Sequence, residues 1–142
     1  MRPSTLKRLE RFNIALDLLR KALRRSREEY LENIELQSIV ERNIQVGVEF
    51  VVDLSSYILS RLNIPTPETY GQVIAEAHKL GIFDDEIAEK MRKLIGLRNI
   101  IVHLYADISS EIVYDNLPEI IGVLSRAVNE LIAFSRRRGL DP

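Results

Sequence analysis

The sequence predicts an all-α protein, built as an antiparallel bundle of four to five helices. Glycine and proline, which interrupt helices, are scarce, with six and five copies in 142 residues. No stretch alternates apolar and polar residues for long enough to indicate a strand. Apolar residues recur instead at intervals of three and four, which is the spacing of one helix face. A chain of this length is the size of one domain and can bury about 68–70% of its unfolded surface, so we expect residues 1–142 to form a single domain.

Composition excludes several classes of protein. The absence of cysteine rules out a disulfide framework and a cysteine-based zinc site. Acidic residues such as Glu49 and Asp53 interrupt the apolar runs, none of which approaches the ~20 residues of a membrane span. The N-terminal residues lack the apolar core of a signal peptide, and we expect a cytoplasmic protein. A net charge of -1 means that any site for a polyanion must be local.

The first three helices follow from their caps and apolar stripes. Ser4 is a candidate N-cap for a first helix that runs to about Arg25. Ser26 followed by Glu29 has the spacing of a capping box, which indicates a second, short helix. A long helix over about 33–62 is apolar on more than one side, so it should be central. The stripe of the first helix consists of Leu6, Leu9, Phe12, Leu16, Leu19 and Leu23.

Two further helices lead to the polar motif. Pro65 ends the long helix, and a helix over about 69–80 stops at Gly81, a residue common just beyond a helix end. Asp84 or Asp85 then caps a helix that continues toward residue 98.

The last part of the chain is helical after a break at residues 106–110. Residues 111–116 have a helical pattern, and Pro118 removes one backbone amide, which predicts either a kink or a fresh start. The final helix should end at about Arg137.

The candidate site lies within residues 98–105, where Arg98, His103 and Tyr105 alternate with strongly apolar residues. His103 is the first candidate for acid–base chemistry, because an unperturbed imidazole titrates near neutral pH. Arg98 can clamp a phosphate through its fork of donors, and Asn99 can donate hydrogen bonds to the same substrate. The other histidine, His78, is expected on a helix surface.

Helix geometry limits what one copy of this motif can do. At about 100° per residue, Arg98 and His103 lie ~140° apart, whereas Asn99 and His103 share a face. Either the helix loosens near His103, or two copies meet across a symmetry axis to complete one site. The broad apolar surface of the long helix and of the helix that carries the motif also favours a symmetric dimer.

The spacing of Arg98, His103 and Tyr105, with Asn99 directly after the arginine, resembles the signature of the HEPN superfamily. Residues 41–49, Asp53, Tyr70 and the segment 96–99 resemble the corresponding residues of its HepT branch. The resemblance extends from about Val40 to the C-terminus.

This resemblance implies a HEPN-like helical bundle and a metal-independent endoribonuclease toxin that acts as a homodimer without a cofactor. Arg98 and His103 would be catalytic, and Arg98 and Asn99 would bind the RNA substrate. The resemblance also implies a type II- or type VII-like toxin–antitoxin pair, with a nucleotidyltransferase antitoxin. In some such pairs the antitoxin transfers AMP to the motif tyrosine, which is Tyr105 here.

Two alternatives stay open from the sequence. The chain could be a non-catalytic helical module that binds a nucleotidyltransferase and helps it hold its substrate. Glu41, Arg42, Glu49 and Asp53 have near-helical spacing and could form an ion-pair network or face a substrate. The basic clusters at residues 24–27 and 136–138 are expected to be solvated helix ends, with phosphate contact as the second interpretation.

Overall fold

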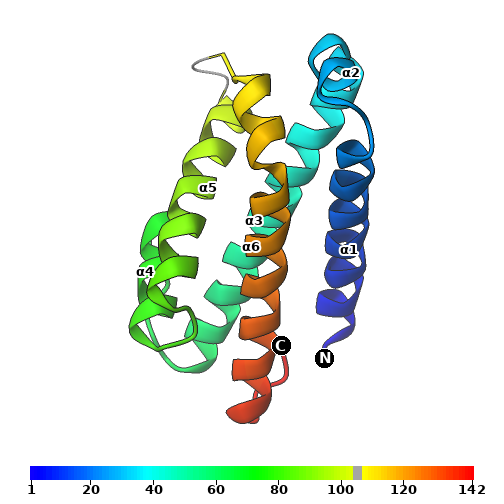
Figure 1. The fold of residues 1–142 in the computed structure, drawn as a ribbon. Helices are drawn as coiled ribbons and strands as arrows, with labels where there is room; N and C mark the ends of the chain where they lie inside the picture. Colours follow the sequence, from blue (N-terminus) through cyan, green and yellow to red (C-terminus); the bar gives the residue numbers. More distant parts are fainter. Residues whose placement is uncertain (104–106) are drawn as a thin grey trace.

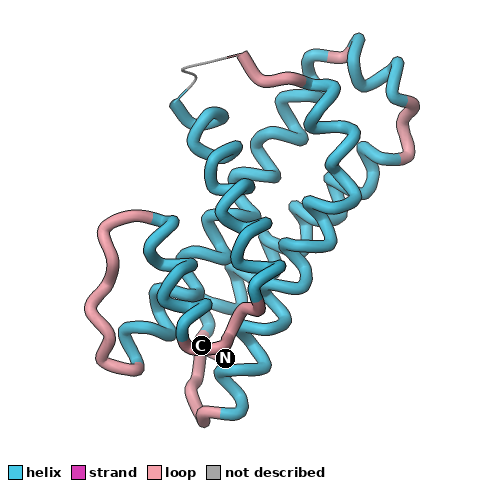
Figure 2. The backbone as a smooth tube through the Cα atoms, turned by 60° about the vertical axis from the view of Figure 1, so that its left-hand side comes forward, coloured by secondary structure: helices cyan, strands magenta, loops and turns pink. Residues whose placement is uncertain are grey.

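A computed structural model describes residues 1–103 and 107–142, and within these ranges it contains six α-helices and no strand (Figure 1). This confirms the all-α prediction. The long helices α1 and α3, and likewise α3 and α5, run antiparallel, and the connecting loops lie at the ends of the bundle (Figure 2). The helices are α1 Pro3–Leu23, α2 Arg27–Glu32, α3 Ile34–Arg61, α4 Tyr70–Lys79, α5 Asp85–His103 and α6 Ser110–Arg137.

The helix starts agree with the capping signals in all but the first case. Helix α1 begins at Pro3, so the expected N-cap at Ser4 is wrong. The fixed φ angle of proline suits the first helical position, where no amide hydrogen is needed. Ser26 caps α2 by accepting a hydrogen bond from the backbone amide of Glu29 at 3.1 Å, as the capping-box spacing predicts. Asp84, one of the two aspartates proposed, accepts from the amide of Ile87 at 2.8 Å.

Helix α6 is continuous across Pro118, so the fresh start considered for this position does not occur. Proline removes the hydrogen bond to the carbonyl four residues earlier but leaves the flanking turns intact. On both sides of it, Leu117, Ile120 and Ile121 are buried in the core. Packing of these side chains therefore holds the helix together through the missing bond.

Helix α3 is the central element, as its broad apolar surface predicts. It packs against each of the other five helices in the described structure. Its residues Ile44, Val48, Val51, Ile58 and Leu59 have no exposed surface. None of the helices in the described ranges combines the length and apolar character needed to cross a membrane.

Gly47 lets α3 and α6 approach closely. A Cβ atom added there would lie 2.7 Å from Cδ1 of Leu124, well inside van der Waals contact. Leu124 is itself completely buried. A larger residue at this position would therefore force the Leu124 side chain to shift.

Candidate functional site

Arg98 lies on α5 and its guanidinium is held against α3 and α4. Nη2 donates to Glu49 Oε1 of α3 at 3.1 Å and to the hydroxyl of Tyr70 at 3.4 Å. The guanidinium carbon lies 4.6 Å from the centre of the Tyr70 ring, which is a cation–π distance. Only 16% of the Arg98 side chain is exposed, compared with 29% for Glu49. The arginine is therefore a partly buried, paired cation with a restricted orientation.

Asn99 and His103 face a different direction from Arg98. Both are exposed, and His103 is the last residue of α5. Because α5 stays helical through His103, the ~140° angle between Arg98 and His103 persists, and the helix does not loosen before the histidine. Arg98 Nη1 donates to Asn99 Oδ1 at 3.1 Å, which connects the two faces. A single chain thus does not turn Arg98 and His103 toward one point.

Tyr105, the predicted modification site, lies outside the described residues. Its role as the residue that receives AMP therefore stays a prediction.

The outward face of α5 is unusually open and apolar around the motif. A Cβ added to Gly96 would meet nothing within 4 Å, so the packing of the described chain does not require this glycine. Ile100 and Val102 are each 37% exposed, although both are large apolar residues. An exposed glycine in a helix interior costs about 1 kcal/mol relative to alanine. A surface that another molecule approaches closely would account for both features.

A pocket of about 440 Å³ lies beside this face, between α5 and α6. Leu97 and Ile100 of α5 line it, together with Ile112 near the start of α6. Ile112 is 64% exposed. Lys90 and Lys93 are the basic residues of its lining. Sequence reasoning missed this pocket, because its lining follows the ordinary helical spacing of a core-facing stripe.

Two acidic residues of α3 form ion pairs with other helices, and a third is partly buried. Glu49 pairs with Arg98, and Asp53 pairs with Arg8 of α1, so both belong to ion pairs between helices. Glu49 Oε1 also accepts from Gln45 Nε2 at 2.9 Å. Burial raises the pKa of Glu41 above its usual range. Arg42 is exposed. The ion-pair interpretation therefore holds for Glu49 and Asp53, and Glu49 additionally contacts a motif residue.

A buried tyrosine lies near Glu41. Tyr30 has no exposed surface, and its ring centre is 5.2 Å from that of Tyr114. Burial, with a smaller contribution from the charge of Glu41, raises the pKa of Tyr30 to about 12. Its hydroxyl has no hydrogen-bond partner within residues 1–103 and 107–142.

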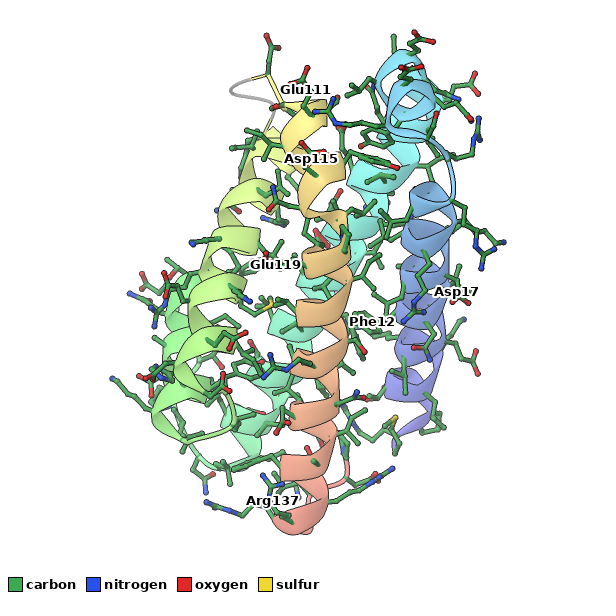
Figure 3. The ribbon with its side chains drawn as sticks, in the orientation of Figure 1. Phe12, Asp17, Glu111, Asp115, Glu119 and Arg137 are labelled. Atoms are coloured by element: carbon green, nitrogen blue, oxygen red, sulfur yellow. The ribbon has the colours of Figure 1, made fainter. Side chains whose placement is uncertain are left out.

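The basic helix ends mostly form ion pairs or lie far from the motif. Arg25 pairs with Glu29 at 2.5 Å, and Arg27 pairs with Asp115 of α6 at 2.9 Å; the side chains of both pairs are exposed, as expected for solvated helix ends. Arg137 lies at the opposite end of α6 from Asp115 (Figure 3). Helix α5 ends at the end of the bundle where α6 begins (Figure 1). The cluster at 136–138 is therefore remote from His103.

His78 is half-buried, and its Nε2 lies 2.6 Å from Asp85 Oδ1, so it belongs to a local contact between α4 and α5. Across the described ranges, no group of three or more histidine, cysteine, aspartate or glutamate residues has the geometry to hold a metal ion.

Solved structures of toxins share the fold of this chain. A tri-AMPylated Shewanella oneidensis HEPN toxin in complex with MNT antitoxin superimposes with a TM-score of 0.85. The match covers 94% of this chain and 99% of that one at 16% sequence identity. A toxin–antitoxin structure with AMP-PNP gives a TM-score of 0.82, at 15% identity over 92% of this chain and 99% of that one. At these identities, the matches show a common fold.

Sequence comparison identifies relatives at higher identity. The tRNA nuclease HepT of Aphanizomenon flos-aquae is 35% identical over 107 residues, which cover 75% of this chain and 73% of that protein. A protein of Archaeoglobus fulgidus named as a candidate RNase is 30% identical over 122 residues, covering 74% and 92% of the two chains. Residues 12–131 match the family described as Ribonuclease HepT-like. The chain belongs to this HepT-like ribonuclease family.

Proposed function

We propose that the protein is the metal-independent endoribonuclease toxin of a toxin–antitoxin pair, with residues 1–142 as one domain. The proposal rests on the arrangement of Arg98, Asn99 and His103 on helix α5. It holds the Arg98 guanidinium in a fixed position and presents Asn99 and His103 on its exposed face. The family, and the nuclease names of the relatives, agree with this assignment.

The chemistry needs three groups. Cleavage of RNA through its 2′-hydroxyl requires a base for the hydroxyl proton, an acid for the leaving oxygen and a cation for the charge on phosphorus. His103 supplies the imidazole that accepts or donates a proton near neutral pH. Arg98 supplies the cation, and the amide nitrogen of Asn99 donates to a phosphate oxygen. The imidazole that takes the 2′-hydroxyl proton as base becomes the imidazolium that protonates the leaving oxygen as acid, so the proton balance needs no metal ion.

A homodimer completes this site. Arg98 and His103 point in different directions on one α5, so a second copy related by a two-fold axis is needed to place the histidine of one chain near the arginine of the other. Gly96, Ile100 and Ile112 form an open, apolar surface next to the motif, which suits contact with a second copy.

The proposed partner is a nucleotidyltransferase antitoxin, which silences the toxin by transferring AMP to Tyr105. The structural relative described above is a tri-AMPylated toxin bound to an MNT antitoxin. An AMP group on Tyr105 would add negative charge and bulk two residues from His103. Its phosphate would compete with the RNA phosphate for the Arg98 guanidinium.

A second candidate function is a non-catalytic module that binds a nucleotidyltransferase. The specific observation in its favour is that Glu49 already neutralises Arg98, in a chain with a net charge of -1. Such a chain has a weaker electrostatic attraction for RNA than a basic protein would have.

Substitution of His103 separates the two functions. His103→Ala should abolish RNA cleavage, whereas His78→Ala, which changes the histidine bonded to Asp85, should retain it. Cleavage by the unmodified protein should be the same with and without EDTA. Cleavage that persists in His103→Ala, or that EDTA stops, would contradict the proposed mechanism. Absence of cleavage by the unmodified, AMP-free protein would favour the binding module.

A further inference from the structure

Besides the bond from Nη1 to Asn99 on its own helix, Arg98 is contacted by side chains of two other helices. Glu49 of α3 accepts one Nη2 bond, and the hydroxyl of Tyr70, the first residue of α4, accepts the other. The Tyr70 ring also lies against the guanidinium, 4.6 Å from centre to carbon. These three contacts fix both the plane and the direction of the guanidinium.

The group that holds Arg98 is itself fixed. Gln45 lies one turn before Glu49 on α3, and its amide donates to the same oxygen, Oε1, at 2.9 Å. Tyr70 follows Thr69, whose hydroxyl caps α4 by accepting from Gln72 at 3.2 Å, so its backbone is anchored as well. Side chains locked by such contacts hold a neighbour more precisely than mobile ones do.

The Nε of Arg98 is buried and has no hydrogen-bond partner in the described part of the chain. A buried donor without a partner is unfavourable, and native structures rarely contain one. In the described structure the guanidinium is therefore held through its Nη atoms and its face, and not through Nε.

We infer that Glu49 and Tyr70 are positioning residues for RNA cleavage, which hold the Arg98 guanidinium at the angle from which it clamps the phosphate. This inference rests on the proposed ribonuclease function and extends it to two residues outside the motif. Glu49 has a second effect, because its carboxylate shares the guanidinium with the incoming phosphate and so weakens RNA binding.

The two effects of Glu49 predict that its substitution slows cleavage without weakening RNA binding. In Glu49→Gln the amide keeps the size of the side chain but removes its charge. Arg98 is then less firmly held, and kcat should fall about 100-fold, since misplacing a reacting group by about 1 Å has that effect. KM should stay the same or fall, because a carboxylate no longer competes with the substrate. A purely structural role would not separate KM from kcat in this direction.

Tyr70 can be tested in two parts. Tyr70→Phe keeps the ring under the guanidinium and removes only the 3.4 Å hydrogen bond, so kcat should fall by less than in Tyr70→Leu, which removes both contacts. A matched control exists at Tyr57, whose ring lies 3.6 Å from the Arg2 guanidinium, away from the motif. Tyr57→Leu removes a similar stacked pair and should leave kcat unchanged.

The control for Glu49 is Asp53, one turn further along α3, which pairs with Arg8 instead of Arg98. Asp53→Asn removes the same charge from the same helix and should not reduce kcat. Glu49→Asp, which restores a carboxylate on a shorter side chain, should recover part of the lost kcat.

RNA binding provides a readout that does not depend on cleavage. In a His103→Ala background, Glu49→Gln should bind single-stranded RNA more tightly and with a steeper salt dependence than Asp53→Asn does. If cleavage by the unmodified protein is absent, the proposed ribonuclease function fails, whereas the binding comparison still tests the hold of Glu49 on Arg98. Equal effects of Glu49→Gln and Asp53→Asn on kcat and on binding would overturn the inference.

Discussion

Gly47→Ala should destabilise the protein, because α3 and α6 leave no room for one more carbon. The added Cβ would lie 2.7 Å from Cδ1 of Leu124, 3.5 Å from Cδ2 and 3.6 Å from Cγ. Because Leu124 is fully buried, any shift of this methyl group has to be accommodated by the surrounding core. Overpacking of this kind typically costs about 1–3 kcal/mol. Replacing a helical glycine by alanine returns about 0.8–1.0 kcal/mol, so we expect a net loss of up to about 2 kcal/mol.

Urea denaturation at equal protein concentrations measures this loss. Gly122→Ala in α6 is the matched control, because nothing lies within 4 Å of its added Cβ. That variant should gain up to about 1 kcal/mol in the free energy of unfolding. In the double variant Gly47→Ala/Leu124→Ala, the two losses should be less than additive, since the second change opens space for the first. If Gly47→Ala is as stable as Gly122→Ala, the close approach of α3 and α6 is wrong.

Three further predictions concern assembly, pH and control. Gly96→Arg should leave the monomer fold intact but prevent dimer formation, measured by size-exclusion chromatography with light scattering. The control Gly122→Arg should remain dimeric. If both variants are dimers, the proposed α5 interface is wrong. Burial raises the pKa of Glu41 in the folded state, so ionisation of Glu41 destabilises the fold as pH rises above the ordinary pKa of 4.5. Glu41→Gln should therefore have a higher free energy of unfolding than the unmodified protein at pH 7, and this difference should disappear below pH 4.5. Glu130→Gln is the control and should show no such gain. Tyr105→Phe should cleave RNA yet resist silencing by the nucleotidyltransferase; equal silencing of Tyr105→Phe and the unmodified protein, with no AMP-sized mass increase in the latter, would indicate occlusion by binding.

The sequence predicts the helices well because their signals are local. Caps such as Ser26 and Asp84 act within three residues, and both occur where the pattern indicates. The fate of Pro118 was not predictable in this way. Whether a helix continues through a proline depends on the packing of Leu117 and Ile120 against the rest of the core, which the local sequence does not reveal.

The motif residues could be recognised from spacing, but their partners could not. Helix geometry already separates Arg98 from His103, and the structure confirms that α5 is regular up to the histidine. The hydrogen bond between Arg98 and Tyr70 joins residues 28 positions apart in the sequence, and the bond between Arg98 and Glu49 joins residues 49 positions apart. Such contacts depend on how α3, α4 and α5 pack, so a single sequence indicates the candidates without showing which of them touch.

Mixed dimers test the central claim most directly, because the proposed site combines Arg98 of one chain with His103 of the other. Arg98→Ala and His103→Ala should each be inactive as homodimers. A mixed dimer of the two variants contains one site with both residues intact and one site with neither. Co-purified through two different affinity tags, it should recover about half the RNA cleavage of the unmodified dimer. A mixed dimer as inactive as its parents would show that Arg98 and His103 must act from the same chain, and the shared site would be wrong.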